Sequence, residues 1–202
     1  MGVPDRESAR ASLGIASDSF VILFRAASDE VKGLQYLIEA LSIASPRKPT
    51  TLLAVEKTGL LLGLPEEYDI REYGWADDAL YAQLLGACDV VLAPYPWAVG
   101  MGLMAVEAMV AARTIVCFED TSIAAVTYAP ECGVSVPNRD ARALRAALDR
   151  LMDHPEECRA RGKAGQEIAL RQYSQERYVD GMARLYEQIH SKSARGAAGP
   201  GR

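Results

Sequence analysis

The sequence predicts an α/β fold built on a doubly wound, mostly parallel sheet. Strand-like and helix-like stretches alternate along the chain, which is the pattern of parallel sheets with helices on both faces. Several strand candidates are continuous apolar runs, as expected of strands that are covered on both faces; the stretch 20–24 is an example. The chain has 202 residues, half of them hydrophobic, which is enough for one sizeable core.

The predicted elements follow in order from the apolar patterns. We expect strands at 20–24, 51–55, 69–73, 88–94, 114–118 and 133–136. Leu34, Leu37, Ile38 and Leu41 recur at helical spacing, and Asp77 or Asp78 caps a second helix. Further helices are expected after Gly102 and at 123–128, 140–152, 155–172 and 174–189. Residues 1–190 form one domain, and the Gly-, Ala- and Ser-rich segment 191–202 is expected to be a disordered tail.

The composition excludes several classes of function. A net charge of −5 argues against a nucleic-acid surface. No apolar run is long enough to span a bilayer, and no signal-peptide pattern is visible. The four cysteines lack metal-like spacing, so we interpret them as buried thiols in a reducing compartment and expect a cytoplasmic protein.

A glycine turn between the fourth strand and the following helix is the most informative stretch. Gly100 and Gly102 let the backbone approach a ligand closely, and the amides from Gly102 to Met104 can point at a phosphate. An ordinary tight turn would also explain two glycines. The combination of strand, glycine turn and helix favours an anion site at the carboxyl end of the sheet.

Glu107 is the single acid on that apolar helix. Either it faces a ligand cleft or it is an acid favoured by the helix dipole near the helix start. A carboxylate can accept hydrogen bonds from two adjacent ribose hydroxyls. We prefer the ligand-binding interpretation because a buried acid needs a partner.

Two cations follow the first strand. Arg25 ends that strand, and Lys32 with Gly33 opens the next helix. Two positive charges beside a helix N-terminus suit a diphosphate. A pair of solvated surface charges is the alternative.

Together these pieces resemble the C-terminal, nucleotide-sugar-binding domain of the family-4 retaining glycosyltransferases of the GT-B fold, one Rossmann-like half of that fold. The resemblance covers about residues 12–189 and rests on the order of several short motifs: Phe24-Arg25, Val31-Lys32-Gly33-Leu34, Glu39-Ala40-Leu41, Tyr73-Gly74-Trp75, Ala87-Cys88-Asp89-Val90, Gly102-Leu103-Met104-Ala105-Val106-Glu107-Ala108-Met109 and Pro130-Glu131-Cys132-Gly133.

The resemblance implies specific roles. Arg25 and Lys32 would hold the donor diphosphate as the catalytic pair, Glu107 would bind the ribose, and the amides of Leu103 and Met104 would touch phosphate. The substrate-binding set it implies is Gly74, Trp75, Val99, Gly100, Met101, Gly102, Leu103, Met104 and Glu107. The implied chemistry is hexosyl transfer from a nucleotide-diphosphate sugar, such as a UDP-sugar, to a hydroxyl with retention, without a cofactor or an obligatory metal.

The chain departs from the family pattern in the glycine turn. Val99 stands where the family has a glutamate that contacts the donor sugar, and valine cannot accept hydrogen bonds from hydroxyls. Met101 replaces an aromatic residue, and Ala112 and Thr114 replace the usual Gly and Pro. The first departure bears on sugar transfer, whereas the other two are expected to change packing only.

The family's enzymes need a second Rossmann-like domain, which would carry the acceptor site. We therefore expect a missing N-terminal domain or partner subunit, through which the protein could also associate with a membrane, and an isolated domain that is inactive. The alternative is a non-catalytic nucleotide-sugar-binding or scaffold partner subunit. A nucleotide-sugar epimerase or a phosphorylase is a weaker possibility, and a dehydrogenase is disfavoured because no G-x-G-x-x-G follows the first strand.

Overall fold

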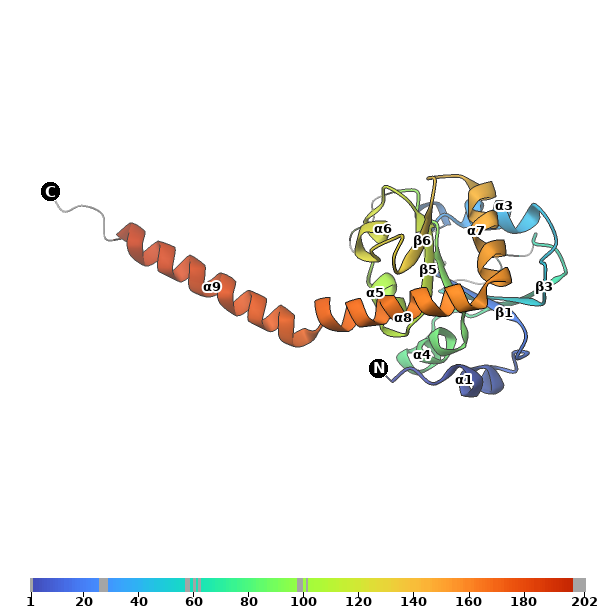
Figure 1. The fold of residues 1–202 in the computed structure, drawn as a ribbon, viewed down its shortest axis with the longest axis horizontal. Coiled ribbons are helices and arrows are strands. Elements are labelled where there is room, and N and C mark those ends of the chain that lie inside the picture. The colour runs from blue at the N-terminus through green and yellow to red at the C-terminus, as the bar shows by residue number, and fades with distance from the viewer. Residues whose placement is uncertain are drawn as a thin grey trace.

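The computed structural model contains a six-stranded sheet in the order β3-β2-β1-β4-β5-β6, and every neighbouring pair is parallel. It describes residues 2–25, 29–56, 59, 61, 63–97, 100 and 102–197. The strands are β1 (Phe20–Arg25), β2 (Thr50–Val55), β3 (Tyr68–Glu72), β4 (Val90–Ala93), β5 (Thr114–Phe118) and β6 (Gly133–Val136). The predicted doubly wound α/β fold is confirmed (Figure 1).

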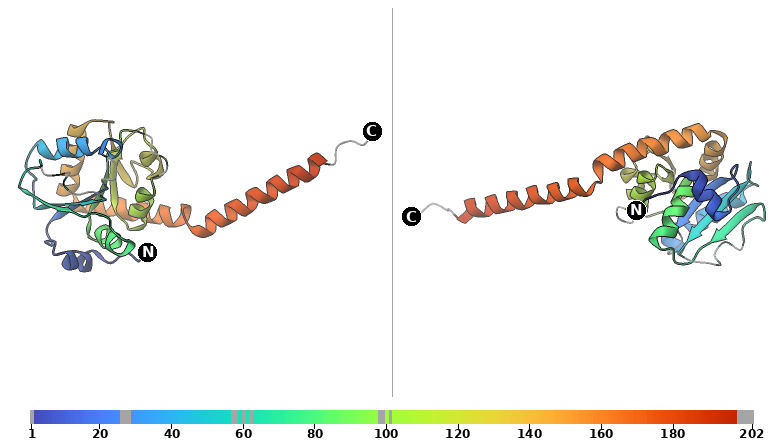
Figure 2. Two further views of the ribbon diagram at one scale, coloured as in Figure 1. Left: turned by 180° about the vertical axis from the view of Figure 1, so that it is seen from behind. Right: turned by 90° about the horizontal axis from the view of Figure 1, so that it is seen from below.

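Helices cover both faces of the sheet (Figure 2). Their bounds are α1 (Arg6–Leu13), α2 (Asp29–Lys32), α3 (Leu34–Ser42), α4 (Asp78–Ala87), α5 (Leu103–Val110), α6 (Ser122–Val126), α7 (Ala141–Asp153), α8 (Pro155–Gln172) and α9 (Gln175–Ala197). Helices α3 and α7 pack with alternate residues of β1, such as Ile22 and Phe24. Helices α1, α4 and α5 pack on the other face with Val21 and Leu23. Because the central strands are buried on both faces, their sequences are continuously apolar.

The strand order places a topological switch point between β1 and β4. The chain leaves β1 toward β2 on one side, and it reaches β4 on the other side only after β3. In open α/β sheets, ligands bind in the crevice at the carboxyl ends of the strands at such a point. The fold therefore directs attention to the residues that follow β1, β2 and β4.

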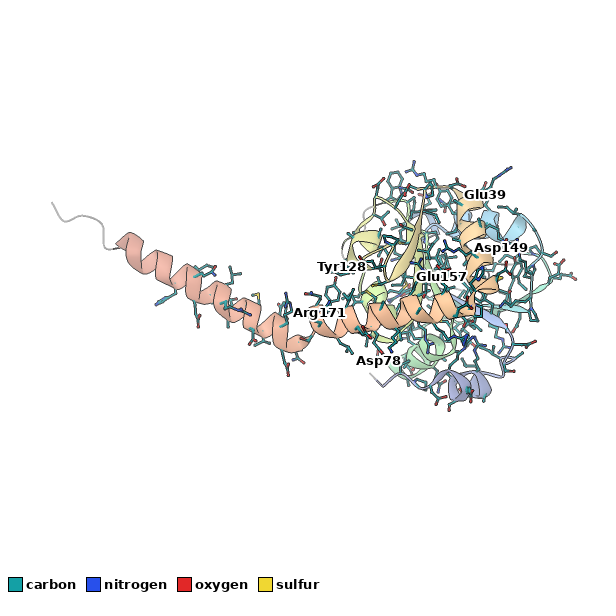
Figure 3. All side chains as sticks on the ribbon, in the orientation of Figure 1. Glu39, Asp78, Tyr128, Asp149, Glu157 and Arg171 are labelled. Carbon is teal, nitrogen blue, oxygen red and sulfur yellow. The ribbon has the colours of Figure 1, made fainter. Side chains whose placement is uncertain are left out.

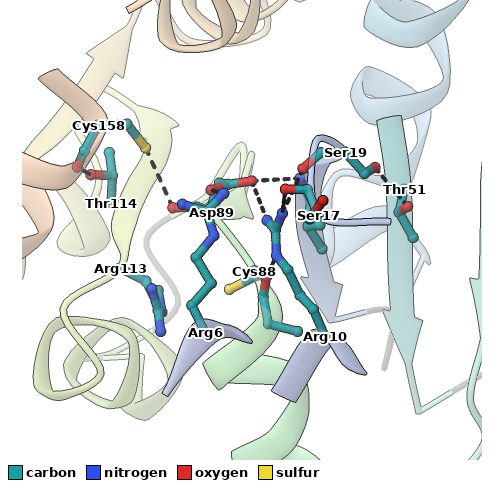
Figure 4. A network of polar contacts seen from close by, with 12 residues as sticks. Arg6, Arg10, Ser17, Ser19, Thr51, Cys88, Asp89, Arg113, Thr114 and Cys158 are labelled. Carbon is teal, nitrogen blue, oxygen red and sulfur yellow. Dashed lines mark hydrogen bonds and ion pairs between the residues drawn. The ribbon is translucent and has the colours of Figure 1, made fainter. Parts of the chain in front are cut away.

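Helix α1 was not expected from the sequence. Asp5 caps its N-terminus, and Gly14 ends it in the left-handed conformation. Its Arg10 is buried and donates hydrogen bonds to Asp89 and to the carbonyl of Ala87 (Figure 4). Because a buried charged side chain contributes to the packed face, the periodic apolar pattern that reveals other helices is weak here.

Helix α9 projects away from the domain (Figure 1), and its side chains from Gln175 to His190 stand clear of the sheet and its layers (Figure 3). From Gln175 to His190 every side chain is exposed except that of Met182, which is half-buried. The helix continues to Ala197, so the expectation of disorder from residue 191 is wrong for 191–197. That segment contains Lys, Arg and Ala, which favour helix, beside its Ser and Gly. Residues 198–202 lie outside the described residues.

None of the helices within the described ranges is long and apolar enough to cross a membrane.

Candidate functional site

A small cavity lies at the carboxyl edge of the sheet, beside the switch point. Its volume is about 140 Å³. Residues from the ends of β1 and β2, from the loop after β3 and from helices α4 and α5 line it: Arg25, Val55, Glu56, Trp75, Ala76, Asp78, Tyr81 and Glu107. Three of the residues predicted for the site, Arg25, Trp75 and Glu107, are thus brought together although they lie far apart in the sequence.

Arg25 forms an ion pair with Glu56 across the ends of the two adjacent parallel strands. Its Nε atom donates to Glu56 Oε1, and its guanidinium carbon lies 5.7 Å from the centroid of the Tyr81 ring. Burial alone would lower the pKa of Arg25, but the hydrogen bond and the charge of Glu56 outweigh it and raise that pKa. Arg25 is therefore a fixed, partly buried cation rather than a solvated surface charge.

Lys32 ends α2, immediately before Gly33, which precedes α3. Its Nζ lies 4.4 Å from the centroid of the Tyr95 ring, a cation–π contact. Burial lowers the pKa of Lys32, and the charge of Arg25 lowers it further against the opposing charge of Glu56. The two predicted cations are therefore close enough for the charge of one to affect the other, and together they can attract a multiply charged anion.

Glu107 presents an unpartnered carboxylate oxygen to the cavity. Its Oε2 atom, like Glu56 Oε2, is buried with no hydrogen-bond partner within the described residues, and the Tyr81 hydroxyl lies beside the Glu107 carboxylate. Leaving such a group unpaired costs about 1–3 kcal/mol. Burial and then the charge of Glu107 raise the pKa of the Tyr81 phenol, so it stays a neutral donor. The cavity therefore offers the Glu107 carboxylate, with the Tyr81 hydroxyl beside it, to a ligand that carries hydroxyl groups.

The position of Glu107 in α5 bears on the two interpretations of this residue. It is the fifth residue of Leu103–Val110, and no acid lies in the first turn of that helix. The helix dipole acts mainly within the first turn. Its position on the cavity supports the ligand-binding interpretation.

Two glycines in the left-handed conformation directly precede the helices α3 and α5 at this edge of the sheet. Gly33 has φ +73°, and a Cβ there would lie 1.9 Å from the Pro94 carbonyl oxygen, so α3 begins directly against the end of β4. Gly102, with φ +65°, precedes α5 without a side-chain cap. The amides of Leu103 and Met104 begin α5, where a helix can bind an anion.

The remaining predicted residues divide into three groups. Gly74 accepts a hydrogen bond of 3.0 Å from the Glu56 amide, and the 84% exposed Trp75 forms the rim of the cavity. Gly100 has φ +65° and open space around it, Leu103 is exposed, and Met104 is buried, where it accepts a hydrogen bond from the Tyr95 hydroxyl at 3.7 Å. Val99 and Met101 lie outside the described residues.

The sequence analysis assigned no role in the site to Glu56, Tyr81 or Tyr95. Glu56 directly follows a buried strand, so its place at the carboxyl edge was available from the sequence as a signal. The two tyrosines look like ordinary core aromatics, and only the packing of α4 and of the loop after β4 shows that they contact the cations.

Four larger cavities lie elsewhere among the described residues, and two of these exceed the rest in volume. One of about 840 Å³ is at the amino edge of the sheet, where Arg6 and Arg10 already pair with Asp89 (Figure 4). The other, of about 620 Å³, lies beside α3 and contains Trp97 stacked with Arg139. Neither contains an unpartnered buried polar side-chain atom of the described residues, unlike the cavity at Glu107.

Comparison with known proteins places these features in a family context. The family model described as "Glycosyl transferases group 1" matches residues 5–168. The MMP alpha-(1->4)-mannosyltransferase of Mycolicibacterium hassiacum is 28% identical over 184 residues, which cover 86% of this chain and 44% of that protein.

Solved structures show the same fold. Sucrose-phosphate synthase from Thermosynechococcus elongatus matches with a TM-score of 0.78 and 25% identity, over 93% of this chain and 50% of that one. Anabaena HepE in complex with UDP-glucose matches with a TM-score of 0.74 and 19% identity, over 95% and 54%. The chain thus spans about half the length of these relatives.

Proposed function

Because this chain belongs to the group 1 glycosyl transferase family, we propose that it is the donor-binding half of a glycosyltransferase of the GT-B fold. The donor is a nucleotide-diphosphate sugar, and the sugar passes to a hydroxyl acceptor with retained configuration. The complex of Anabaena HepE with UDP-glucose supports a UDP-sugar as the first donor to test. A cytoplasmic location belongs to the same proposal.

One observation carries the proposal: a buried carboxylate oxygen of Glu107 with no hydrogen-bond partner among the described residues lies in one cavity with the fixed cation Arg25, and Lys32 is close enough for the charge of Arg25 to lower its pKa. Glu107 Oε2, with the Tyr81 hydroxyl beside it, can accept a hydrogen bond from a ligand with hydroxyl groups, such as a ribose. Arg25 and Lys32 provide positive charge for the diphosphate. A nucleoside diphosphate supplies both kinds of group in one molecule.

In the proposed reaction, this chain stabilises the leaving nucleotide. Negative charge develops on the diphosphate as the bond to the sugar breaks. Arg25 and Lys32 already have fixed contacts with Glu56 and Tyr95, and the N-terminal amides of α5 are held by the helix, so little reorganisation is needed in the transition state. The acceptor and any group that handles its proton would come from a second domain.

Isothermal titration calorimetry with UDP and GDP tests the proposal. We expect wild-type binding, and a loss of about tenfold or more in Glu107→Ala, because a hydrogen bond to a charged group is worth about 1.5–3 kcal/mol. Lys32→Ala should weaken binding similarly. Glu39→Ala, an exposed acid on α3, is the matched control and should bind like wild type. If the wild-type chain binds neither UDP nor GDP, the proposal is wrong.

Val99 is the observation that favours a second candidate function, that of a non-catalytic nucleotide-sugar-binding partner subunit. A valine offers no acceptor to a donor sugar. In that case the chain joined to its second domain binds the donor without transferring sugar, and Val99→Glu creates transfer. Sugar transfer with Val99 in place would exclude this alternative.

A further inference from the structure

The Arg25–Glu56 ion pair engages only one of the three guanidinium nitrogens of Arg25. Glu56 accepts from Nε of Arg25, and neither terminal guanidinium nitrogen has a hydrogen-bond partner among the described residues. A guanidinium held at Nε still has its two terminal nitrogens available for bidentate contact with a phosphate. The pair therefore fixes Arg25 without using up its binding face.

Glu56 is itself held in place by strained backbone. Its φ is +83°, in the left-handed region that a residue with a side chain rarely adopts. The Glu56 amide donates to the Gly74 carbonyl at 3.0 Å, which ties the end of β2 to the loop after β3. Strained residues of this kind are concentrated at ligand sites, where surrounding structure maintains them.

Tyr81 restricts Arg25 from a second side. The guanidinium carbon lies 5.7 Å from the centroid of that ring, on helix α4. An arginine side chain that is free in solution loses much rotamer entropy when a ligand orders it, and an arginine already fixed avoids that loss on binding. The opposing effect is the negative charge of Glu56, which disfavours a diphosphate nearby.

We propose that Glu56 is a positioning residue of the diphosphate site: it orients Arg25 through Nε so that both terminal nitrogens face the donor phosphates. This inference rests on the proposed function. It concerns the hydrogen-bond acceptor at residue 56 and not the charge, so an uncharged acceptor should replace the carboxylate.

Two substitutions separate position from charge and from folding. Glu56→Gly removes the acceptor, and glycine suits a φ of +83°, so the fold should be at least as stable as in wild type. Glu56→Gln keeps an acceptor for Nε and removes the charge. Asp153→Ala, which removes the exposed ion-pair partner of Arg47, is the matched control.

Calorimetry on the full chain with UDP and with uridine provides the readout. We expect Glu56→Gly to bind UDP about tenfold more weakly, as for a lost contact to a charged group, while its uridine affinity stays within about twofold. Glu56→Gln should bind UDP at least as tightly as wild type, and Asp153→Ala should match wild type. Thermal unfolding of each variant shows whether its fold is intact.

A double-mutant cycle with Arg25→Ala closes the test. If Glu56 acts through Arg25, Glu56→Gly changes UDP affinity little once Arg25 is absent. Full additivity, or a Glu56→Gly variant that binds UDP like wild type, would overturn the positioning role while the proposed function stands. A wild-type chain that binds no UDP would overturn both, and in that case Glu107→Ala would also show no effect.

Discussion

At the scale of single residues, the lowered pKa of Lys32 makes ligand binding depend on pH. Its Nζ sits over the Tyr95 ring, and burial with the charge of Arg25 lowers its pKa below that of an ordinary lysine. The ammonium is therefore lost at a lower pH than is usual for lysine. A bound diphosphate opposes that loss, so binding takes up protons in alkaline solution.

We predict that UDP affinity falls as the pH rises toward the range in which Lys32 loses its proton. The ordinary pKa of a lysine side chain is about 10.4, and the fall in affinity should begin at a lower pH than that value implies. Calorimetry across alkaline pH measures it. Lys32→Arg is the control, because a guanidinium stays protonated throughout and should remove most of the pH dependence. An equal pH dependence in wild type and Lys32→Arg would contradict the role given to Lys32.

Residue by residue, the sequence identified the charged groups better than their partners. Arg25 was predictable because it ends an apolar strand, and Glu107 because it is the single acid on an apolar helix. The contact of Glu56 with Arg25 was not predictable, because it depends on the parallel register of β1 with β2, which pairs Arg25 with Val55. Tyr81 reaches the same cavity from α4, and no local pattern indicates the direction of its side chain.

At the scale of elements, the start of α3 is fixed by Gly33 against β4. We predict that Gly33→Ala lowers the free energy of unfolding by more than the about 1–2 kcal/mol that a left-handed alanine costs alone. The added methyl would meet the Pro94 carbonyl, which is backbone and cannot rotate away. Urea unfolding measures the loss.

Gly14→Ala is the control for that prediction. Gly14 has φ +62°, and nothing lies within 4 Å of an added Cβ. It should show the conformational cost without the clash. Equal losses in the two variants would show that the contact between Gly33 and Pro94 contributes nothing.

Helix α9 makes a second element-scale prediction. Because its side chains from Gln175 to His190 are exposed apart from half-buried Met182, it contributes little burial to the domain. We predict that a chain ending after Tyr173, whose hydroxyl contacts the Val126 carbonyl at 3.2 Å, keeps its melting temperature within about 2 °C. A larger fall on thermal unfolding would mean that α9 packs on the domain in solution.

The same elements show which features of the fold follow from sequence. Buried strands such as β1 and β5 are apolar without interruption, so their positions and the parallel sheet could be predicted. Helix α1 was not predicted because its buried face includes Arg10. Helix α9 extends beyond the predicted boundary because Lys, Arg and Ala continue the helical pattern. Polar burial and helix ends are decided by contacts that periodicity does not encode.

At the scale of the whole molecule, the chain spans about half the length of the relatives described above. We predict that it binds a nucleotide diphosphate alone and transfers sugar only when joined to a second domain that supplies the acceptor site. Release of free UDP from a UDP-sugar in the presence of an acceptor measures transfer. Steady transfer by residues 1–202 alone would contradict this division of labour.

The central claim is that the donor nucleotide binds at the carboxyl edge of the sheet, between Arg25 and Glu107. Amide chemical-shift mapping by NMR during a UDP titration tests it most directly. We predict the largest shifts at Glu56, Gly74 and residues 102–107, with Asp5, Arg10 and Asp89 at the opposite edge unchanged. Shifts concentrated at that amino edge, in the larger cavity of about 840 Å³, would contradict the claim.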